Sequence, residues 1–314
     1  MIARPPALIA KSKVMRTLLG EARRYAAADA NLLISGETGV GKDALARLVH
    51  LSGPRRKEPF LIVDCPGLPA TLVESELFGH ERGAFTDATI ARAGRFEAAG
   101  RGTVYLDAVS GLSADAQGAI LRVVEEKRVT RLGGTSASDV RARIIASADA
   151  GIERAVRDGA FRTDLYHRLS VLPLVVPPLR ERPEDILPMA ARFLADIAAS
   201  LRRDAPELTR DAADALQRYH WPGNARELRH TLERVLVGGV GDRIAATDLP
   251  VHVLQGEDAY LARRDGERPA LAEVERRYIE LVLREVDGSQ TRAAKILGIS
   301  RKALWEKRRR YGIS

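Results

Sequence analysis

The sequence has 314 residues, 45% of them apolar and 29% charged, which is enough for two or three domains with buried cores. No apolar run approaches the length of a membrane span, and the first residues lack the apolar core and cleavage site of a signal peptide. The single cysteine, Cys65, excludes an internal disulfide framework. We therefore expect no membrane association and a location in the reducing cytoplasm.

The positive charge gathers at the C-terminal end. The formal net charge is +8, and residues 291–314 alone carry +7. Apolar residues interleave with these charges at helical spacing, which argues against a solvated, disordered basic tail. A basic end on a near-neutral body is typical of proteins that bind nucleic acid.

A helix is expected from about residue 7 to 28, followed by a short apolar strand, Leu32–Ile34. A glycine loop then leads into an amphipathic segment, residues 44–49. Strand, glycine loop and helix together form the context of a phosphate-binding P-loop, in which backbone N–H groups turn toward an anion at a helix N-terminus. We expect the loop to bind nucleotide through Gly36, Glu37, Thr38, Gly39, Val40, Gly41, Lys42 and Asp43, with Lys42 reaching the outer phosphates.

One position departs from the general P-loop pattern. Asp43 stands where Ser or Thr usually helps to hold Mg²⁺. The alternative interpretation is a plain glycine turn between a strand and a helix, and the lysine in this context makes it the weaker one.

Further apolar strands are expected at residues 60–65, 103–107, 143–147 and 171–176, with helical segments between them. Such alternation after a P-loop indicates an α/β fold with a parallel sheet and nucleotide at the strand ends. Asp107 ends one of these strands, where a carboxylate is the usual second partner for Mg²⁺. A helix-capping aspartate in an α/β connection is the alternative.

Two segments stand out between and after these strands. Residues 74–88 are predicted to form a helix end and a loop with a lone aromatic residue, Phe85, at its tip. Residues 161–169 place two arginines, Arg162 and Arg168, six residues apart in a partly apolar segment.

The pattern becomes all-helical from residue 184 to about 239, which predicts a small helical domain, and residues 251–268 have the composition of a linker. The last segment predicts a helix-turn-helix: a helix over 291–297, a turn at Gly298, and a second helix from an N-cap at Ser300 to about Tyr311.

The second of these helices is basic and is the predicted recognition helix for DNA. Its cations would divide between phosphates and base edges: Arg301, Lys302, Lys307, Arg308, Arg309 and Arg310. We expect Leu304 and Trp305 to face the domain core, and a dimer to bind half-sites one helical turn apart.

Taken in order, these motifs resemble the sigma-54-interacting AAA+ transcription activators, the bacterial enhancer-binding proteins with a Fis-type DNA-binding domain. The resemblance runs from about residue 8 to 313, and an acid after the P-loop lysine is ordinary in that family. It implies an AAA+ P-loop subdomain over 7–182, a helical lid over 183–250, a linker over 251–268 and a helix-turn-helix domain over 269–314.

The resemblance also implies roles for particular residues and partners. Arg162 and Arg168 correspond to arginine fingers that reach the ATP of a neighbouring subunit, and Arg226 to a sensor that touches nucleotide. The family's signature loop, which contacts the sigma factor, corresponds to Gly83, Ala84, Phe85, Thr86, Asp87 and Ala88. ATP, Mg²⁺, DNA, RNA polymerase with sigma-54 and a homo-oligomer between dimer and hexameric ring follow as expected partners.

Three departures from the family fall in working parts. Ala108 replaces the glutamate that orients and deprotonates the attacking water, which an alanine cannot do. Asp149 aligns with the asparagine of the first sensor, so a carboxylate would stand near the γ-phosphate. Asp87 replaces a glycine of the signature loop, which adds charge and removes backbone freedom.

Two hypotheses follow from these departures. The chain is either an ATP-hydrolysing activator of sigma-54 polymerase, or a regulator that binds ATP and DNA, hydrolyses ATP slowly or not at all, and acts through another sigma factor or as a repressor. Ala108 and Asp149 favour the second mechanism, while Arg162 and Arg168 serve either. Ala108 as an engineered substitution that traps ATP is the weaker alternative, because Asp87 and Asp149 also depart from the family. Removal of an N-terminal regulatory domain stays open. We expect ATP binding with weak hydrolysis.

Overall fold

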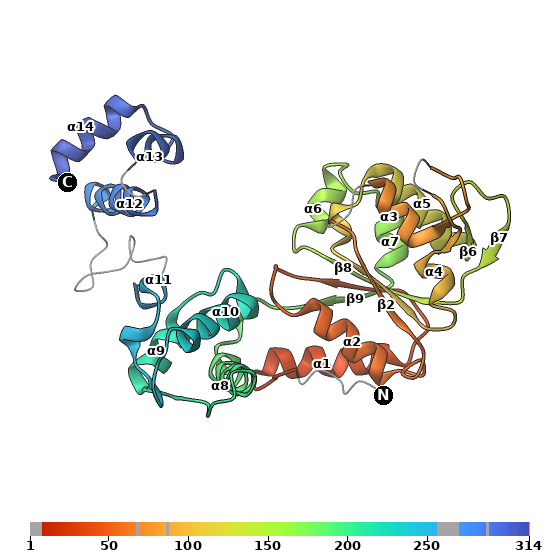
Figure 1. The fold of residues 1–314 in the computed structure, drawn as a ribbon, viewed down its shortest axis with the longest axis horizontal. Coiled ribbons are helices and arrows are strands. Elements are labelled where there is room, and N and C mark those ends of the chain that lie inside the picture. The colour runs from red at the N-terminus through yellow and green to blue at the C-terminus, as the bar shows by residue number, and fades with distance from the viewer. Residues whose placement is uncertain (1–7, 67–69, 86–87, 256–269, 287–288, 314) are drawn as a thin grey trace. The chain divides into compact units, whose positions relative to one another are not determined.

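The computed structural model describes residues 8–66, 70–85, 88–255, 270–286 and 289–313 (Figure 1). The chain divides into two compact units, one containing residues up to 209 together with 220–244, the other containing 210–219 together with the residues from 245 onward. The domain boundaries expected from the sequence stay predictions.

A five-stranded parallel sheet forms the centre of the first unit, in the order β2-β5-β8-β1-β9. Every pair of neighbouring strands runs parallel. The α/β interpretation of the sequence is thereby confirmed, with strands at Leu32–Ser35 (β1), Phe60–Asp64 (β2), Thr103–Asp107 (β5), Arg143–Ala148 (β8) and Leu172–Val175 (β9).

Alternate residues of each strand point to opposite sides of the sheet, and helices cover both faces. Val104 and Leu106 of β5 belong to one hydrophobic cluster, while Tyr105 between them belongs to the other. One face is covered by α1 (Lys13–Ala26) and α2 (Lys42–Ser52). The other is covered by α3 (Ala70–Phe78), α4 (Arg95–Ala98), α5 (Ala114–Glu126), α6 (Ile152–Arg157) and α7 (Thr163–Leu169).

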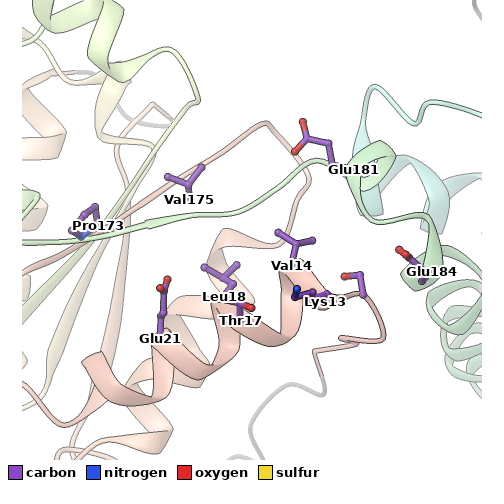
Figure 2. Close-up of a pocket in the computed structure, with 10 residues that line it drawn as sticks. Lys13, Val14, Thr17, Leu18, Glu21, Pro173, Val175, Glu181 and Glu184 are labelled. Atoms are coloured by element: carbon purple, nitrogen blue, oxygen red, sulfur yellow. The ribbon is translucent and has the colours of Figure 1, made fainter.

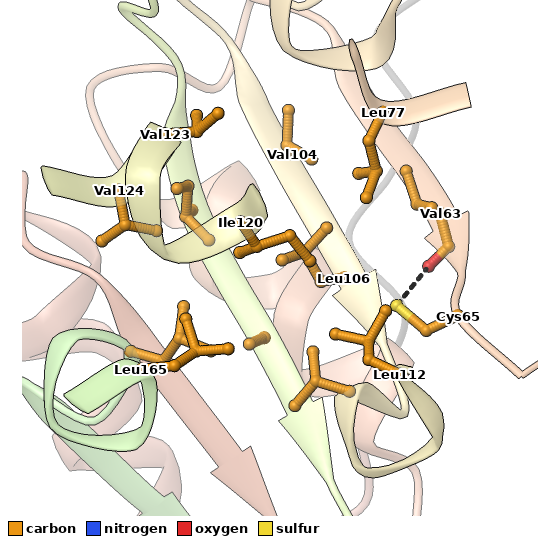
Figure 3. Close-up of a cluster of buried hydrophobic side chains, with 14 of the residues drawn as sticks. Val63, Cys65, Leu77, Val104, Leu106, Leu112, Ile120, Val123, Val124 and Leu165 are labelled. Carbon is orange, nitrogen blue, oxygen red and sulfur yellow. Dashed lines mark hydrogen bonds between the residues drawn. The ribbon is translucent and has the colours of Figure 1, made fainter. Parts of the chain in front are cut away.

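The apolar residues of α5 recur at helical spacing and pack into the cluster that contains Val104 and Leu106. Ile120 is fully buried beside Leu106, and Val123 and Val124, one turn further along α5, are buried in the same cluster (Figure 3). Burying one such side chain contributes about 1.5–3 kcal/mol, so this packing fixes the strand ends that carry the polar site. Cys65 lies at the rim of the cluster as a buried strand-end residue, as expected, and burial raises the pKa of its thiol to about 12.

Short hairpins and helices complete the first unit. β3 (Gly79–His80) pairs with β4 (Arg92–Ala93), and β6 (Arg128–Thr130) pairs with β7 (Ala137–Asp139). The helix η2 (Leu179–Glu181) leads into α8 (Pro183–Ser200), which begins with proline at its first position and packs against α10 (Asn224–Val237). The strands β10 (Glu207–Leu208) and β11 (Arg243–Ile244) pair in parallel.

The second unit is helical. It contains α9 (Arg210–Arg218), η3 (Ala246–Asp248) and α11 (Val251–Gln255), and the C-terminal helices α12 (Leu271–Glu285), α13 (Gln290–Ile296) and α14 (Arg301–Tyr311). The last two helices form the expected helix-turn-helix. Gly298 in the turn has φ +66, and the Ser300 hydroxyl accepts a bond from the backbone N–H of Ala303, as expected of an N-cap. Among the described residues, no helix is long and apolar enough to span a membrane.

Candidate nucleotide site and DNA-binding helix

The glycine loop lies between the end of β1 and the first residue of α2. Gly41, the N-cap of α2, has φ +99, and Gly39 has φ +80. A Cβ on Gly39 would stand 2.3 Å from the carbonyl oxygen of Gly223 and 3.1 Å from Cβ of Arg226, so the loop passes directly against the segment that precedes α10. A loop of this shape presents unsatisfied N–H groups at a helix N-terminus, which is an anion site.

The lysine of the loop is folded back over it. Lys42 Nζ donates to the carbonyl oxygens of Gly36 (2.7 Å) and Glu37 (3.2 Å), and its side chain is 11% exposed. Asp149 Oδ1 lies 3.6 Å from the same nitrogen. The structure therefore places a carboxylate beside the lysine that is expected to reach the outer phosphates.

Asp107 is held in place at the end of β5. Its Oδ1 accepts hydrogen bonds from the hydroxyls of Ser147 (2.6 Å) and Tyr105 (3.0 Å), and Ser147 Oγ also accepts from the backbone N–H of Ala108 (2.8 Å). Burial raises the pKa of Tyr105, so the phenol stays a donor. Ala108 has a left-handed backbone, with φ 55° and ψ 55°. Sequence reasoning missed Ser147 because a small polar residue inside a buried strand carries no signal of its own.

The carboxylates of this site suit a metal ion that binds together with a nucleotide, and not one whose ligands all come from the protein. Among the described residues, no group of three His, Cys, Asp or Glu side chains could hold a metal ion. Mg²⁺ bound with a nucleotide needs only one or two carboxylates, because phosphate oxygens and waters supply the remaining ligands. Asp107, with both of these hydrogen bonds on Oδ1, and Asp43 in the first turn of α2 fit that requirement.

Polar side chains connect the glycine loop to the helical part of this unit. Together we call them the clamp: Glu37, Arg180, Arg182 and Asn224. Glu37 receives two bonds from Arg180 (2.9 and 2.6 Å) and one from Asn224 Nδ2 (3.1 Å), and the bonds from Arg180 lower the pKa of its carboxyl. The buried Asn224 also donates to Thr38 O (3.0 Å) and accepts from the N–H of Leu179 (2.7 Å).

Arg182 adds a bond from Nη2 to the carbonyl oxygen of Val40 (3.0 Å). Sequence reasoning assigned no site role to Asn224, Arg180 or Arg182. The exposed Arg226, the expected nucleotide sensor, lies beside Gly39 at the loop.

The two expected arginine fingers are exposed and paired within their own chain. Arg162 forms a two-point contact with Asp164 (3.1 and 2.8 Å), which lowers the pKa of that carboxyl to about 2. Arg168 Nε donates to Glu125 (3.1 Å). Both side chains can be reached from outside the chain, as a residue acting in a neighbouring subunit would require.

The expected sigma-factor loop is closed at its base. Gly83 N–H donates to Ala88 O (2.8 Å), and Ala88 N–H donates to Phe85 O (2.9 Å). The half-exposed Phe85 ring lies 5.0 Å from the His80 ring. Ala84 lies against Gly133, where an added Cβ would meet it at 2.9 Å. Thr86 and Asp87 lie outside the described residues.

A cavity of about 650 Å³ runs along α1 and β9 (Figure 2). Val14, Leu18 and Val175 give it apolar walls, while Glu21, Glu181 and Glu184 contribute carboxylates. No residue of the glycine loop lines it, so it is separate from the phosphate site.

The basic side chains of α14 fall into two sets. Arg301, Lys302, Arg309 and Arg310 are exposed, whereas Lys307 Nζ is bonded to Glu275 (2.6 Å). Arg308 is half-buried, and its Nε donates to the carbonyl oxygen of Ile313 (3.4 Å).

The expectation for the two apolar residues of α14 is only half right. Leu304 is buried, but Trp305 is 53% exposed. Trp305 lies about 100° further round the helix than Leu304, and on this short, thinly covered helix that rotation carries the ring out of the core.

Three families match successive parts of the chain: the Sigma-54 interaction domain over residues 8–175, the AAA+ ATPase lid domain over 180–265, and the bacterial regulatory proteins of the Fis family over 270–311.

Two curated relatives are 40% identical to the chain. One is Regulatory protein AtoC of Escherichia coli (strain K12), over 312 residues, 98% of this chain and 68% of that protein. The other is Transcriptional regulatory protein ZraR of Klebsiella oxytoca, over 300 residues, 96% of this chain and 68% of that protein. The chain thus spans about two thirds of the length of these relatives.

Solved structures agree with the sequence relatives. A crystal structure of NtrX from Brucella abortus in complex with ATP has a TM-score of 0.74 and 32% identity, covering 98% of this chain and 70% of that one. The same values hold for NtrX in complex with ADP. With three family matches in the expected order, the chain belongs to the sigma-54-interacting AAA+ transcription regulators that carry a Fis-type helix-turn-helix.

Proposed function

We propose that the chain binds ATP and DNA and regulates transcription as an oligomer assembled through its AAA+ domain. The observation that carries the proposal is the clamped glycine loop at the carboxyl edge of the parallel sheet, with Lys42 held over it. The ATP- and ADP-bound structures of NtrX support nucleotide as the ligand. The exposed basic face of α14 supports DNA.

In this proposal, phosphates bind to the N–H groups of the loop and the first turn of α2, with Lys42 turning from the loop carbonyls toward the outer phosphates. Arg226 contacts the nucleotide from beside Gly39. Asp107 and Asp43 would hold Mg²⁺, which would neutralise charge on the phosphate oxygens.

Hydrolysis is the weak part of this site. A general base contributes roughly 10²- to 10⁴-fold to such a reaction, and Ala108 supplies none. Asp149 adds a negative charge 3.6 Å from the Lys42 ammonium, where a γ-phosphate would compete for the same cation. We therefore propose slow turnover.

Three acids of the chain, Glu37, Glu81 and Asp64, differ in their freedom to replace the missing base. Glu37 is engaged by Arg180 and Asn224, and Glu81 is paired with Arg131 (3.2 Å). Asp64 is exposed and ends β2 directly beside Asp107 in the strand register. Residual turnover, where it occurs, would depend on Asp64 more than on Glu37 or Glu81.

The exposed Arg162 and Arg168 support a subunit interface at which each would reach a neighbour's nucleotide, in an assembly between a dimer and a hexameric ring. RNA polymerase carrying sigma-54 is the proposed partner of the Gly83–Ala88 loop. A second candidate is a nucleotide-stabilised regulator that acts without sigma-54, and Ala108 together with Asp87 favours it.

The ATP site is tested by titrating the whole chain with ATP in a calorimeter. Lys42→Ala removes a charged phosphate donor and is expected to weaken binding about 10- to 100-fold, since a charge-assisted bond contributes roughly 1.5–3 kcal/mol. Lys57→Ala, at an exposed lysine elsewhere, is the control and should bind as the wild type does. Equal affinity for all three proteins would contradict nucleotide binding at this loop.

A further inference from the structure

The outward face of α14 carries an aromatic ring between two cations. Arg301, Trp305 and Arg309 are four residues apart, so they form one row on the helix, and all three are exposed. The Arg309 guanidinium carbon lies 5.7 Å from the centroid of the Trp305 ring. A cation at this distance over an indole is attracted to its face, which limits the orientations of both side chains.

The opposite face fixes how α14 is rotated in its domain. Leu304 is fully buried in the cluster formed with α12 and α13. Glu275 of α12 accepts bonds from Lys307 Nζ (2.6 Å) and from the Tyr311 hydroxyl. Because one face is held by packing and ion pairing, the row of Arg301, Trp305 and Arg309 points consistently to the outside.

A single exposed aromatic residue usually needs no explanation. Trp305 differs because it lies in the second turn of the helix that a helix-turn-helix places in the major groove, near the N-terminal residues that contact base edges. Its two neighbours in the row are both arginines, the residue type that reads guanine or binds phosphate. The thymine C5-methyl is the apolar group that the major groove offers to such a ring.

We propose that Trp305 is a sequence-reading residue whose indole contacts a thymine methyl group in the major groove. Arg309 holds the ring in place, and Arg301 contacts the adjacent bases or phosphates. This inference rests on the proposed DNA binding by α14, and it adds the chemical group on the DNA that the helix recognises. It predicts a thymine at one fixed position of each half-site, read by its methyl group.

The test begins with the full-length chain and a pool of randomised DNA duplexes, from which the tightest binders are selected and sequenced. The best duplex is then remade with deoxyuridine replacing each thymine in turn, which deletes one methyl group at a time. Wild-type affinity should fall about 4-fold at one thymine of each half-site, which is the loss expected when one methyl group is no longer buried. Trp305→Ala should bind the thymine and deoxyuridine duplexes equally.

Two further variants separate a lost methyl contact from a damaged fold. Trp305→Phe keeps a ring and should retain part of the thymine preference. Glu306→Ala, at the exposed neighbouring position, should keep the full thymine preference while raising overall affinity, because it removes a negative charge facing DNA. Circular dichroism of each variant should match the wild type.

The outcomes distinguish this proposal from the proposed function. A wild type that binds no duplex would overturn DNA binding by α14, and the methyl contact with it. A wild type that binds DNA but is indifferent to every thymine methyl, or a Trp305→Ala variant that keeps the wild-type preference, would overturn the methyl contact alone. Unchanged DNA binding by Trp305→Ala with a changed oligomeric mass would assign the ring to a protein contact instead.

Discussion

The two sides of the nucleotide site differ: the glycine loop is held by the hydrogen bonds of the clamp, whereas the strand ends lack the residues expected for hydrolysis. On the loop side, Glu37 and Asn224 tie the glycine loop to the helical part of the unit through several short hydrogen bonds. On the strand-end side, Asp107 is held by Ser147, but the next residue is Ala108, and Asp149 stands beside Lys42.

This difference indicates that the parts for binding nucleotide and for hydrolysing it depend on separate residues. The buried Ser147 holds Asp107 in position, and it does so although Ala108 stands where the family has a glutamate. Under the proposed function, ATP would occupy this site without being hydrolysed rapidly, and occupancy itself would be the regulatory signal.

The largest structural effect is expected from breaking the clamp with Asn224→Ala. The change leaves the buried N–H of Leu179 without its acceptor, and it removes two part-buried bonds, to the carbonyl of Thr38 and to Glu37. Unsatisfied buried groups cost roughly 1–3 kcal/mol each, so we expect a destabilisation of about 2–3 kcal/mol. Thermal unfolding should show a lower Tm, and hydrogen exchange should speed up in residues 36–41.

The control for this variant is Asn31→Ala, since Asn31 donates one exposed bond to Arg168 O and lies outside the clamp. Its Tm should move by less than half as much. Equal shifts for both variants would contradict the clamp.

A smaller effect is expected from Asp149→Asn, which tests the charge on the strand-end side. The variant frees Lys42 from a carboxylate that is more than half exposed, so the gain is limited by solvent screening to about 0.5–1 kcal/mol. ATP should bind about 2- to 5-fold more tightly, and ADP should change less because it lacks the γ-phosphate. Calorimetric titration with both nucleotides measures this, and a loss of ATP affinity would show that Asp149 supports binding.

The smallest effect concerns pH. The pKa of Glu37 is lowered in the folded chain, chiefly by its bonds from Arg180, so its contribution to stability is present above its unfolded pKa and is lost as the pH falls through the lowered value. The pair is partly exposed, so the contribution is under about 1 kcal/mol. In urea titrations below about pH 4.5, Glu37→Gln should lose less stability than the wild type does. If the free energies of unfolding of the wild type and of Glu37→Gln fall equally as the pH is lowered, Glu37 does not contribute to the loss of stability in acid.

Local patterns of the sequence were sufficient for the framework of the fold. The strand expected at 103–107 has those bounds, and the one expected at 143–147 ends one residue later. Both are short apolar runs, whose length distinguishes them from the longer amphipathic helices around them. The glycine loop was equally visible, because the residues that shape it are adjacent in the chain.

The clamp was not predictable in the same way. Asn224 and Glu37 are 187 residues apart, and neither residue type signals a partner at that distance. Trp305 was assigned wrongly because consecutive helical residues can both be buried, and sequence alone did not decide that Leu304 is buried while Trp305 is exposed. The roles of Arg162 and Arg168 depend on a second subunit, so they stay predictions.

ATP turnover by the wild type beside Ala108→Glu tests the separation of binding from hydrolysis most directly, with ATP affinity measured on the same samples. We predict similar affinities, turnover well below about one per second in the wild type, and a rise of roughly 10²-fold or more in the glutamate variant, because a general base is restored next to Asp107. Rapid turnover by the wild type, unchanged by the glutamate, would contradict the separation and restore the hydrolysing activator.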